Sequence, residues 1–146
     1  MIRSNIDHLN RGNYQPVLAG FADDATLAFP GSNTWSTMFR PANAGREQHV
    51  THRGRAELER FLQRYVDEGL QMQVEDILVN GPPWNTRVAV RVVDWSLDSD
   101  GNERYCNRAV LFARAVWGKL VEQEDYEDTE RVAAFDRLTA ERSSDV

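Results

Sequence analysis

Apolar residues recur at helical spacing in four segments of the chain. The spacing predicts a helix from Ile2 to Leu9 before Gly12, and a second short helix that Asn13 can cap. A third helix ends at Gly69, which suits a left-handed cap, and Asp128-Thr129 can cap a last helix. The apolar faces of the second, third and last helices are Tyr14, Val17, Leu18 and Phe21; Leu58, Phe61, Leu62, Tyr65 and Val66; and Val132, Phe135 and Leu138.

The hydrophobic period changes to two after Leu70, which indicates strands. Turn residues at 98–102 and 117–119 predict that the later strands pair as an antiparallel meander. Helices followed by long strands and one further helix indicate a single α+β domain over residues 1–146, with helices packed on one face of a curved sheet that leaves a cavity. The expected strands are Ala25 to Phe29, Met72 to Asn80, Arg87 to Leu97, Tyr105 to Trp117 and Lys119 to Tyr126.

Residues 32–52 are predicted as a long excursion without regular structure, either a functional lid or a disordered segment. Its apolar residues Trp35, Met38 and Phe39 suggest that it folds back over the mouth of the pocket, and a dimer contact is the equal alternative. His49 and His52 form an H-x-x-H pair. Because no third ligand lies nearby, a place at the pocket rim or simple solvent exposure is favoured over metal binding.

Alternation along two of the strands predicts which side chains face the cavity. Val88, Val90 and Val92 share a face with Asp94, so this carboxylate ends an apolar face. A buried Asn107 on the next strand needs a partner, which is Asp94, Asp125 or a ligand. The inward set of that strand is uncharged and includes small residues that leave room for a pocket: Tyr105, Asn107, Ala109, Leu111, Ala113, Ala115 and Trp117.

The last strand is acidic, with six acids between Glu122 and Glu130. The simplest interpretation is a solvated edge of the sheet. The alternative places Asp125 inside, on the same side as Gln123 and near Asp94. A carboxylate beside another in an apolar cavity has its ionised form disfavoured by desolvation and by like charge. One of the pair then stays protonated near neutral pH, which supplies a general acid and a general base together.

Composition and charge narrow the range of partners. Of the 146 residues, 41% are hydrophobic and 27% are charged, and the formal net charge of −6 repels nucleic acid. The longest apolar run, residues 109–113, is too short to cross a bilayer, and the first residues do not form a signal peptide. The single cysteine excludes an intramolecular disulfide. We therefore expect a cytoplasmic protein without nucleic-acid or membrane partners.

Short motifs follow one another over nearly the whole chain: Asn10-Arg11-Gly12-Asn13, Phe21-Ala22-Asp23-Asp24-Ala25-Thr26, Phe29-Pro30-Gly31, His52-Arg53-Gly54-Arg55, Tyr105-Cys106-Asn107-Arg108, Gly118-Lys119-Leu120-Val121 and Tyr126-Glu127-Asp128-Thr129. In their order and spacing they resemble the SnoaL-like group of the nuclear-transport-factor-2-like superfamily. The resemblance implies a cone-shaped, mixed or antiparallel sheet wrapped around three to four helices, a pocket for a small apolar or polycyclic molecule, and commonly a homodimer. Members include polyketide cyclases, isomerases, epoxide hydrolases and non-catalytic modules, so the activity must be argued from the site.

The resemblance also assigns individual positions. Asp125 matches the acid/base aspartate of the cyclases, and Asp94 with Asp125 matches the aspartate pair of limonene-epoxide hydrolases. Val92 stands where those hydrolases have a bridging arginine, and their water-positioning residues fall near Leu27 and Phe29. The base aspartate of ketosteroid isomerases also falls on Phe29. The complete hydrolase and ketosteroid isomerase sets are therefore absent.

Two functions remain open. The first is a cofactor-independent enzyme of the cyclase, isomerase or epoxide hydrolase type, in which Asp125 and Asp94 carry out acid/base chemistry. The second is a non-catalytic binding or dimeric accessory module with the same pocket. No metal site and no Gly-rich phosphate loop are expected. The residues predicted to contact the small molecule are Asn107, Tyr105, Trp35, Tyr14, Leu111 and Gln123.

Overall fold

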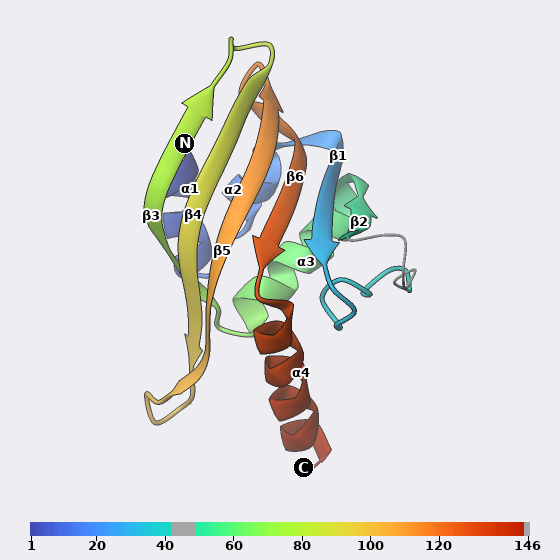
Figure 1. The fold of residues 1–146 in the computed structure, drawn as a ribbon, viewed down its shortest axis with the longest axis vertical. Helices are drawn as coiled ribbons and strands as arrows, with labels where there is room; N and C mark the ends of the chain where they lie inside the picture. Colours follow the sequence, from blue (N-terminus) through green and yellow to red (C-terminus); the bar gives the residue numbers. More distant parts are fainter. Residues whose placement is uncertain (42–48, 145–146) are drawn as a thin grey trace.

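A curved sheet of six strands carries the fold, and three helices cover its concave face (Figure 1). The computed structural model describes residues 1–41 and 49–144. The helices of this described part are α1 (Ile2–Asn10), α2 (Gln15–Ala19), α3 (Gly54–Asp67) and α4 (Thr129–Ser144). The strands are β1 (Phe21–Pro30), β2 (His49–Arg53), β3 (Gln71–Asn80), β4 (Thr86–Leu97), β5 (Glu103–Val116) and β6 (Lys119–Glu127).

The sheet has the strand order β2-β1-β6-β5-β4-β3. The antiparallel meander from β3 to β6 is confirmed. β1 runs parallel to β6 and antiparallel to β2, so the whole sheet is mixed. A tight turn at Trp117 and Gly118, both with positive φ, joins β5 to β6.

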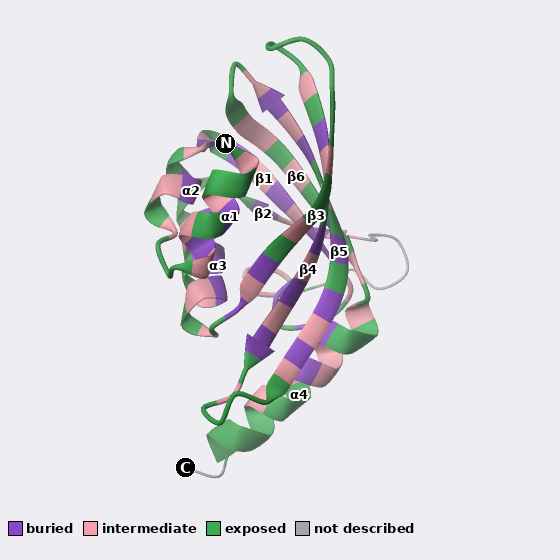
Figure 2. Ribbon diagram, turned by 90° about the vertical axis from the view of Figure 1, so that its left-hand side faces the viewer, coloured by how far each residue is buried: buried purple, intermediate pink, exposed green. Residues whose placement is uncertain are grey.

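The helices lie against one face of the sheet, where the buried residues of the strands gather (Figure 2). Asn10 fastens the end of α1 to the start of β3, because its side chain both donates to the Met72 carbonyl and accepts from the Met72 amide at 2.7 Å. α3 follows the predicted pattern, with Leu58, Phe61 and Tyr65 buried. A helix of this kind is held mainly by its apolar face.

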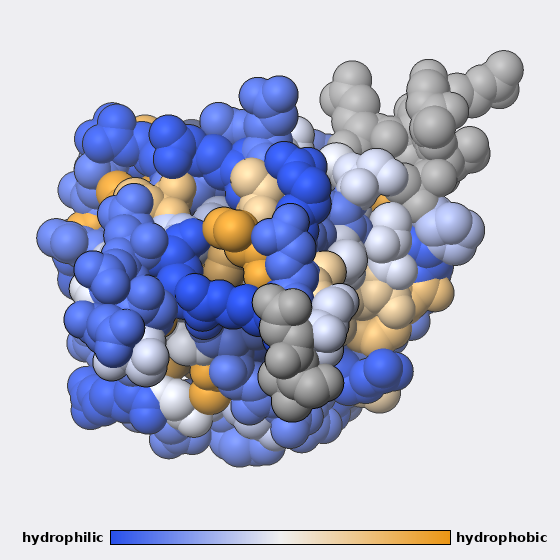
Figure 3. Space-filling view, turned by 90° about the horizontal axis from the view of Figure 1, so that it is seen from below, coloured by the Kyte–Doolittle hydropathy of each residue, from blue (hydrophilic) through white to orange (hydrophobic). Residues whose placement is uncertain are grey.

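α4 lies at the lower end of the molecule and packs against β5. The carboxylate of Asp128 accepts from the Glu130 amide at 3.0 Å and caps the helix as the sequence predicted. Seen from this end, the surface is mainly hydrophilic, with small hydrophobic patches between polar side chains (Figure 3). None of the described helices is both long and apolar enough to cross a membrane.

The first strand is longer than predicted and begins at Phe21, which the helical spacing had placed on α2. α2 ends earlier because the Gly20 carbonyl accepts the Leu120 amide, which draws the chain into the sheet. Asp23 and Asp24 do not break the strand; they lie in an irregularity of its pairing with β6 and stay exposed. The N-cap of α2 is Tyr14 and not Asn13.

The excursion predicted over residues 32–52 is not irregular to its end, because its last residues form β2 and pair with β1. The hydrophobic pattern does not predict this five-residue edge strand, because it lacks alternating apolar residues. Trp35 does not cover a pocket mouth; it is 3% exposed and packs edge-on against Phe61 of α3. Residues 42–48 of the excursion lie outside the described part of the chain.

We predict that α4 contributes to stability through its buried side chains, of which Phe135 is the larger and Val132 the smaller. Phe135 is buried against the ring of Tyr105, at 4.8 Å between centroids, and Leu138 on the same helix is 51% exposed. Phe135→Ala should lower the free energy of unfolding by about 3–5 kcal/mol, and Leu138→Ala by less than about 0.5 kcal/mol. Urea unfolding measures both. Equal effects would mean that α4 does not dock on β5 in solution.

Candidate active site

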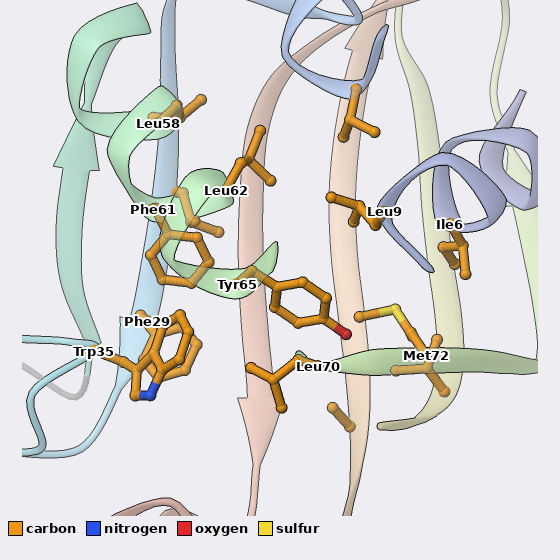
Figure 4. Close-up of a cluster of buried hydrophobic side chains, with 14 of the residues drawn as sticks. Ile6, Leu9, Phe29, Trp35, Leu58, Phe61, Leu62, Tyr65, Leu70 and Met72 are labelled. Atoms are coloured by element: carbon orange, nitrogen blue, oxygen red, sulfur yellow. The ribbon is translucent and has the colours of Figure 1, made fainter. Parts of the chain in front are cut away.

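The space between the helices and the concave face of the sheet is a cavity of about 800 Å³. Its walls are mainly apolar; Figure 4 shows several of the side chains that α1 and α3 contribute. The exposed lining residues Gly81, Pro83 and Gly118 lie at the tips of the β3–β4 and β5–β6 turns, which places the mouth at that end. A volume of this size is typical of sites for small organic ligands.

Asp94 and Asp125 both line this cavity and are each only 7% exposed. β4 turns Val88, Val90 and Val92 inward together with Asp94, as the alternation predicted. On β6, Asp125 is the buried residue between the exposed Glu124 and Tyr126, so the acidic strand is not simply a solvated edge. Two carboxyl groups therefore lie in one apolar cavity.

Burial is the main cause of the raised pKa values of both carboxyl groups. It raises the pKa of Asp94 from 3.8 to about 7, against the opposing hydrogen bond from its own backbone amide. It also raises the pKa of Asp125 from 3.8 to about 7, against a hydrogen bond from Gln123, with the charge of Asp94 raising it further. Both groups thus exchange protons near neutral pH, where acid/base catalysis is most effective.

The two carboxyl groups differ in their partners. Gln123 Nε2 donates to Asp125 Oδ1 at 2.9 Å, which stabilises the ionised form of Asp125. Asp94 Oδ1 is buried and has no hydrogen-bond partner among the described residues. An unpartnered buried polar atom costs about 1–3 kcal/mol, and more when it is charged. Asp94 is therefore the group that gains more from being protonated.

Asn107 has partners other than those expected from the sequence. Its Nδ2 donates to the Tyr105 hydroxyl and to the Asp128 carbonyl, each at 3.0 Å, and its Oδ1 accepts the Arg108 amide at 2.9 Å. None of these is Asp94 or Asp125, and Asn107 is not among the residues lining the cavity. The turn from β6 into α4 supplies the carbonyl, which the strand pattern alone could not show.

Two members of this region were missed by sequence reasoning. Tyr65 of α3 lines the cavity and is 7% exposed, and its hydroxyl has no partner among the described residues. Burial, together with the charges of Asp125, Asp94 and Asp128, raises the pKa of Glu127 to about 9. Glu127 shares the inward face of β6 with Asp125, so the period of two could have pointed to it; Tyr65 was seen only as a core residue.

Of the other residues predicted to contact the ligand, four line the cavity and one does not. Tyr105, Leu111, Gln123 and Trp35 line the cavity. Tyr14 does not line it, because its hydroxyl turns to Glu59 Oε1 on α3, 3.5 Å away.

The two histidines have separate structural roles and do not face solvent as a pair. His52 is fully buried and its Nε2 donates to the Trp35 carbonyl at 3.0 Å, and burial lowers its pKa. The Nε2 of His49 donates to the backbone carbonyl of Asp125 at 2.7 Å. Within residues 1–41 and 49–144, no cluster of three or more His, Cys, Asp or Glu side chains is placed to hold a metal ion.

Comparison with known proteins identifies relatives of this fold. A family model described as a SnoaL-like domain matches residues 2–123. A loop truncation variant of IdmH has a TM-score of 0.67 at 20% identity, covering 89% of this chain and 91% of that one. SalBIII, an epoxide hydrolase/cyclase-like enzyme in pyran ring formation, has a TM-score of 0.66 at 15% identity, with 89% of each chain covered.

A third solved structure is an NTF2-like protein of unknown function from Burkholderia pseudomallei. It has a TM-score of 0.67 at 18% identity, covering 90% of this chain and 93% of that one. At these identities the structural matches establish the shared fold alone. No curated protein sequence matches the chain.

The raised pKa values predict how stability depends on pH. Unfolded carboxyls release their protons near pH 4, whereas Asp94 and Asp125 keep theirs in the folded state until about pH 7. Between these values the folded protein binds more protons than the unfolded chain, so stability falls as pH rises. We expect Asp94→Asn and Asp125→Asn each to reduce this fall, measured by urea unfolding at pH 5 and pH 8.

Glu124→Gln is the matched control, because Glu124 lies next to Asp125 on the exposed side of β6. It should leave the pH dependence close to that of the parent protein. A parent protein that gains stability between pH 5 and pH 8 would show that the two carboxyls are hydrated in solution.

Proposed function

The chain belongs to the SnoaL-like domain family, and we propose that it is an enzyme that moves protons on a small apolar molecule, with Asp125 as general base and Asp94 as general acid. The observation that carries the proposal is the presence of two buried carboxyl groups in one apolar cavity. Groups with a pKa near 7 can both accept and donate protons under neutral conditions.

The roles follow from the hydrogen bonds. Asp125 is the base because Gln123 stabilises its carboxylate at 2.9 Å. Asp94 is the acid because its buried Oδ1 lacks a donor among the described residues, so that its neutral form is preferred. Like charge across the cavity also opposes simultaneous ionisation. At neutral pH the pair then carries one proton, held on Asp94.

The register of the sheet separates the points at which the two groups act. Asp94 lies opposite Asn107 on β5, and Asp125 lies opposite Leu111, four residues farther along the same strand. The two carboxyls make no hydrogen bond to each other. A proton is therefore removed at one position of the substrate and delivered at another. This favours isomerisation or ring closure over activation of one water molecule held between the two acids.

The apolar positions near the pair favour the same choice. Val92, Leu27 and Phe29 stand where the epoxide hydrolase resemblance requires polar residues, and all three are buried. The substrate is then an apolar molecule with a carbonyl group and an acidic C–H bond next to it. Asp125 takes the proton of that C–H bond, whose electron pair becomes an enolate, and Asp94 delivers its own proton elsewhere on the molecule. Exchange with solvent restores both carboxyls.

The alternative is a module that binds a small apolar molecule without chemistry. The nearly complete apolar lining of the cavity favours it, since such walls bind ligands without requiring polar groups. Binding of an apolar molecule does not require buried acids, and burying them lowers the stability of the folded protein. The fold shared with SalBIII, an epoxide hydrolase/cyclase-like enzyme, supports the hypothesis that the protein is an enzyme.

We predict that Asp125→Asn lowers catalysed proton removal by about 100-fold or more, because general bases contribute 10²–10⁴-fold. The measurement is NMR of deuterium uptake at the carbon next to the carbonyl, over a panel of apolar and polyketide-like ketones in deuterium oxide. The parent rate should follow a bell-shaped pH profile centred near pH 7. Asp94→Asn should remove one limb of the bell.

The control for this assay is Glu124→Gln, which should keep the parent rate. An unchanged rate in Asp125→Asn would exclude Asp125 as the base. No exchange by the parent protein with any ketone, despite ligand binding in the cavity, would favour the non-catalytic module.

A further inference from the structure

Two tyrosine hydroxyls at the deep end of the cavity have no part in the acid/base pair. Tyr65 comes from α3 and Tyr105 from β5; each is 7% exposed and each lines the cavity together with Asp94. Figure 4 shows the Tyr65 ring extending from α3 with its hydroxyl directed toward Met72. Met72 is paired with Asp94 across β3 and β4, so Tyr65 points to the level of the sheet at which Asp94 lies.

The position of Tyr65 is fixed by the end of its helix. Ser96 Oγ, two residues beyond Asp94 on the same face of β4, donates to the Glu68 carbonyl at 3.1 Å. This bond ties the last turn of α3 to β4. The Tyr65 hydroxyl itself is buried and unpartnered among the described residues. A phenylalanine would fill the same place without leaving a polar group unpaired, so the hydroxyl has no structural use here.

The proton of Tyr105 is directed by Asn107. The orientation of the Asn107 amide is set by the Arg108 amide, which donates to its Oδ1, and by the Asp128 carbonyl, which accepts from its Nδ2. Nδ2 can only donate, so the Tyr105 oxygen accepts this bond at 3.0 Å. The Tyr105 O–H is then free to donate, and no acceptor for it is found among the described residues.

We propose that Tyr65 and Tyr105 form a subsite that binds the carbonyl oxygen of a neutral apolar substrate. A carbonyl oxygen has two lone pairs and can accept from both hydroxyls at once. The proposal rests on the proposed function and deepens it, because it names the group by which the substrate is oriented. Negative charge that develops on this oxygen as Asp125 removes a proton is stabilised by the same two donors.

The surroundings select against a charged ligand group. Asp94, Asp125 and Glu127 are acidic groups close to the Tyr65 hydroxyl; burial is the largest cause of the raised pKa of Tyr65, and the ionised forms of these acids raise it further. Both phenols therefore remain donors over the working pH range. Among the described lining residues, the basic side chain is Arg3, next to the mouth. A ligand carboxylate at the deep end would lie beside Asp94 and Asp125 with no basic side chain among the described lining residues at that end to neutralise it.

Binding of two matched probes tests this subsite. Acetylnaphthalene carries a carbonyl and ethylnaphthalene does not, while their sizes are similar; titration calorimetry gives both affinities. We expect the parent protein to prefer the ketone by about tenfold, or about 1.4 kcal/mol. Tyr65→Phe and Tyr105→Phe should each remove most of this preference without weakening the hydrocarbon. The carbonyl stretching frequency of the bound ketone should rise in both variants, toward its value in an apolar solvent.

Tyr126→Phe is the matched control, since Tyr126 is 47% exposed on the outer side of β6; it should keep the preference. Thermal unfolding checks that the variants fold, and Tyr65→Phe should be at least as stable as the parent. Asp125→Asn separates the two proposals: it should lose deuterium exchange and keep the ketone preference. A preference unchanged in both phenylalanine variants, or a parent that binds both probes equally or neither, would overturn the subsite.

Discussion

Desolvation of carboxyl groups is the constraint on which the site depends. A β-strand turns alternate residues to one face, so β4 cannot place its valines against the helices without also turning Asp94 inward. β6 does the same with Asp125 and Glu127. The ionised forms of these acids lose their hydration, and their pKa values rise to between about 7 and about 9. The charge state of the cavity follows from this.

The C-terminal half of α3 packs against an aromatic cluster and also reaches the strand that carries Asp94. In this half of the helix, Trp35 packs on Phe61 and stacks under the Arg64 guanidinium at 4.0 Å. His52 holds this segment by its bond to the Trp35 carbonyl. One turn after Arg64, the carbonyl of Glu68 accepts from Ser96 Oγ of β4 and ties the same end of the helix to the strand that carries Asp94. Trp35 and Phe61 also line the cavity, so the aromatic packing on α3 forms part of the wall that faces the ligand.

Much of this arrangement could be predicted from the sequence, because period and turn signals are local. The meander and most of the inward faces of β4 and β5 follow from turn signals and alternation, although Trp117, predicted to face inward, is 69% exposed in the turn after β5. Neither face of β6 is plainly apolar, so alternation allowed a buried Asp125 only as the alternative to a solvated edge. The edge strand β2 could not be predicted, since its five residues alternate weakly and it is defined by pairing with β1. The partners of Asn107 depend on the turn into α4. The role of the Tyr65 hydroxyl depends on the lack of a hydrogen-bond partner for it among the described residues. Both depend on tertiary contacts, which the spacing of residues along the chain does not predict.

The raised pKa values of the acids and the two tyrosine hydroxyls both make the deep end of the cavity suitable for a neutral carbonyl group. Deep in the cavity, protonated Asp94 and Glu127 remove most of the negative charge that would otherwise repel the electron-rich oxygen of a carbonyl. An apolar ligand that fills the cavity displaces water from these acids and disfavours their ionised forms further. Ligand binding and proton retention therefore support each other by linkage, and the effect is greatest near pH 7 and above, where the unliganded acids begin to ionise. Orientation by neutral donors then leaves Asp125, with its bond from Gln123, as the carboxyl best able to carry the charge that proton removal requires.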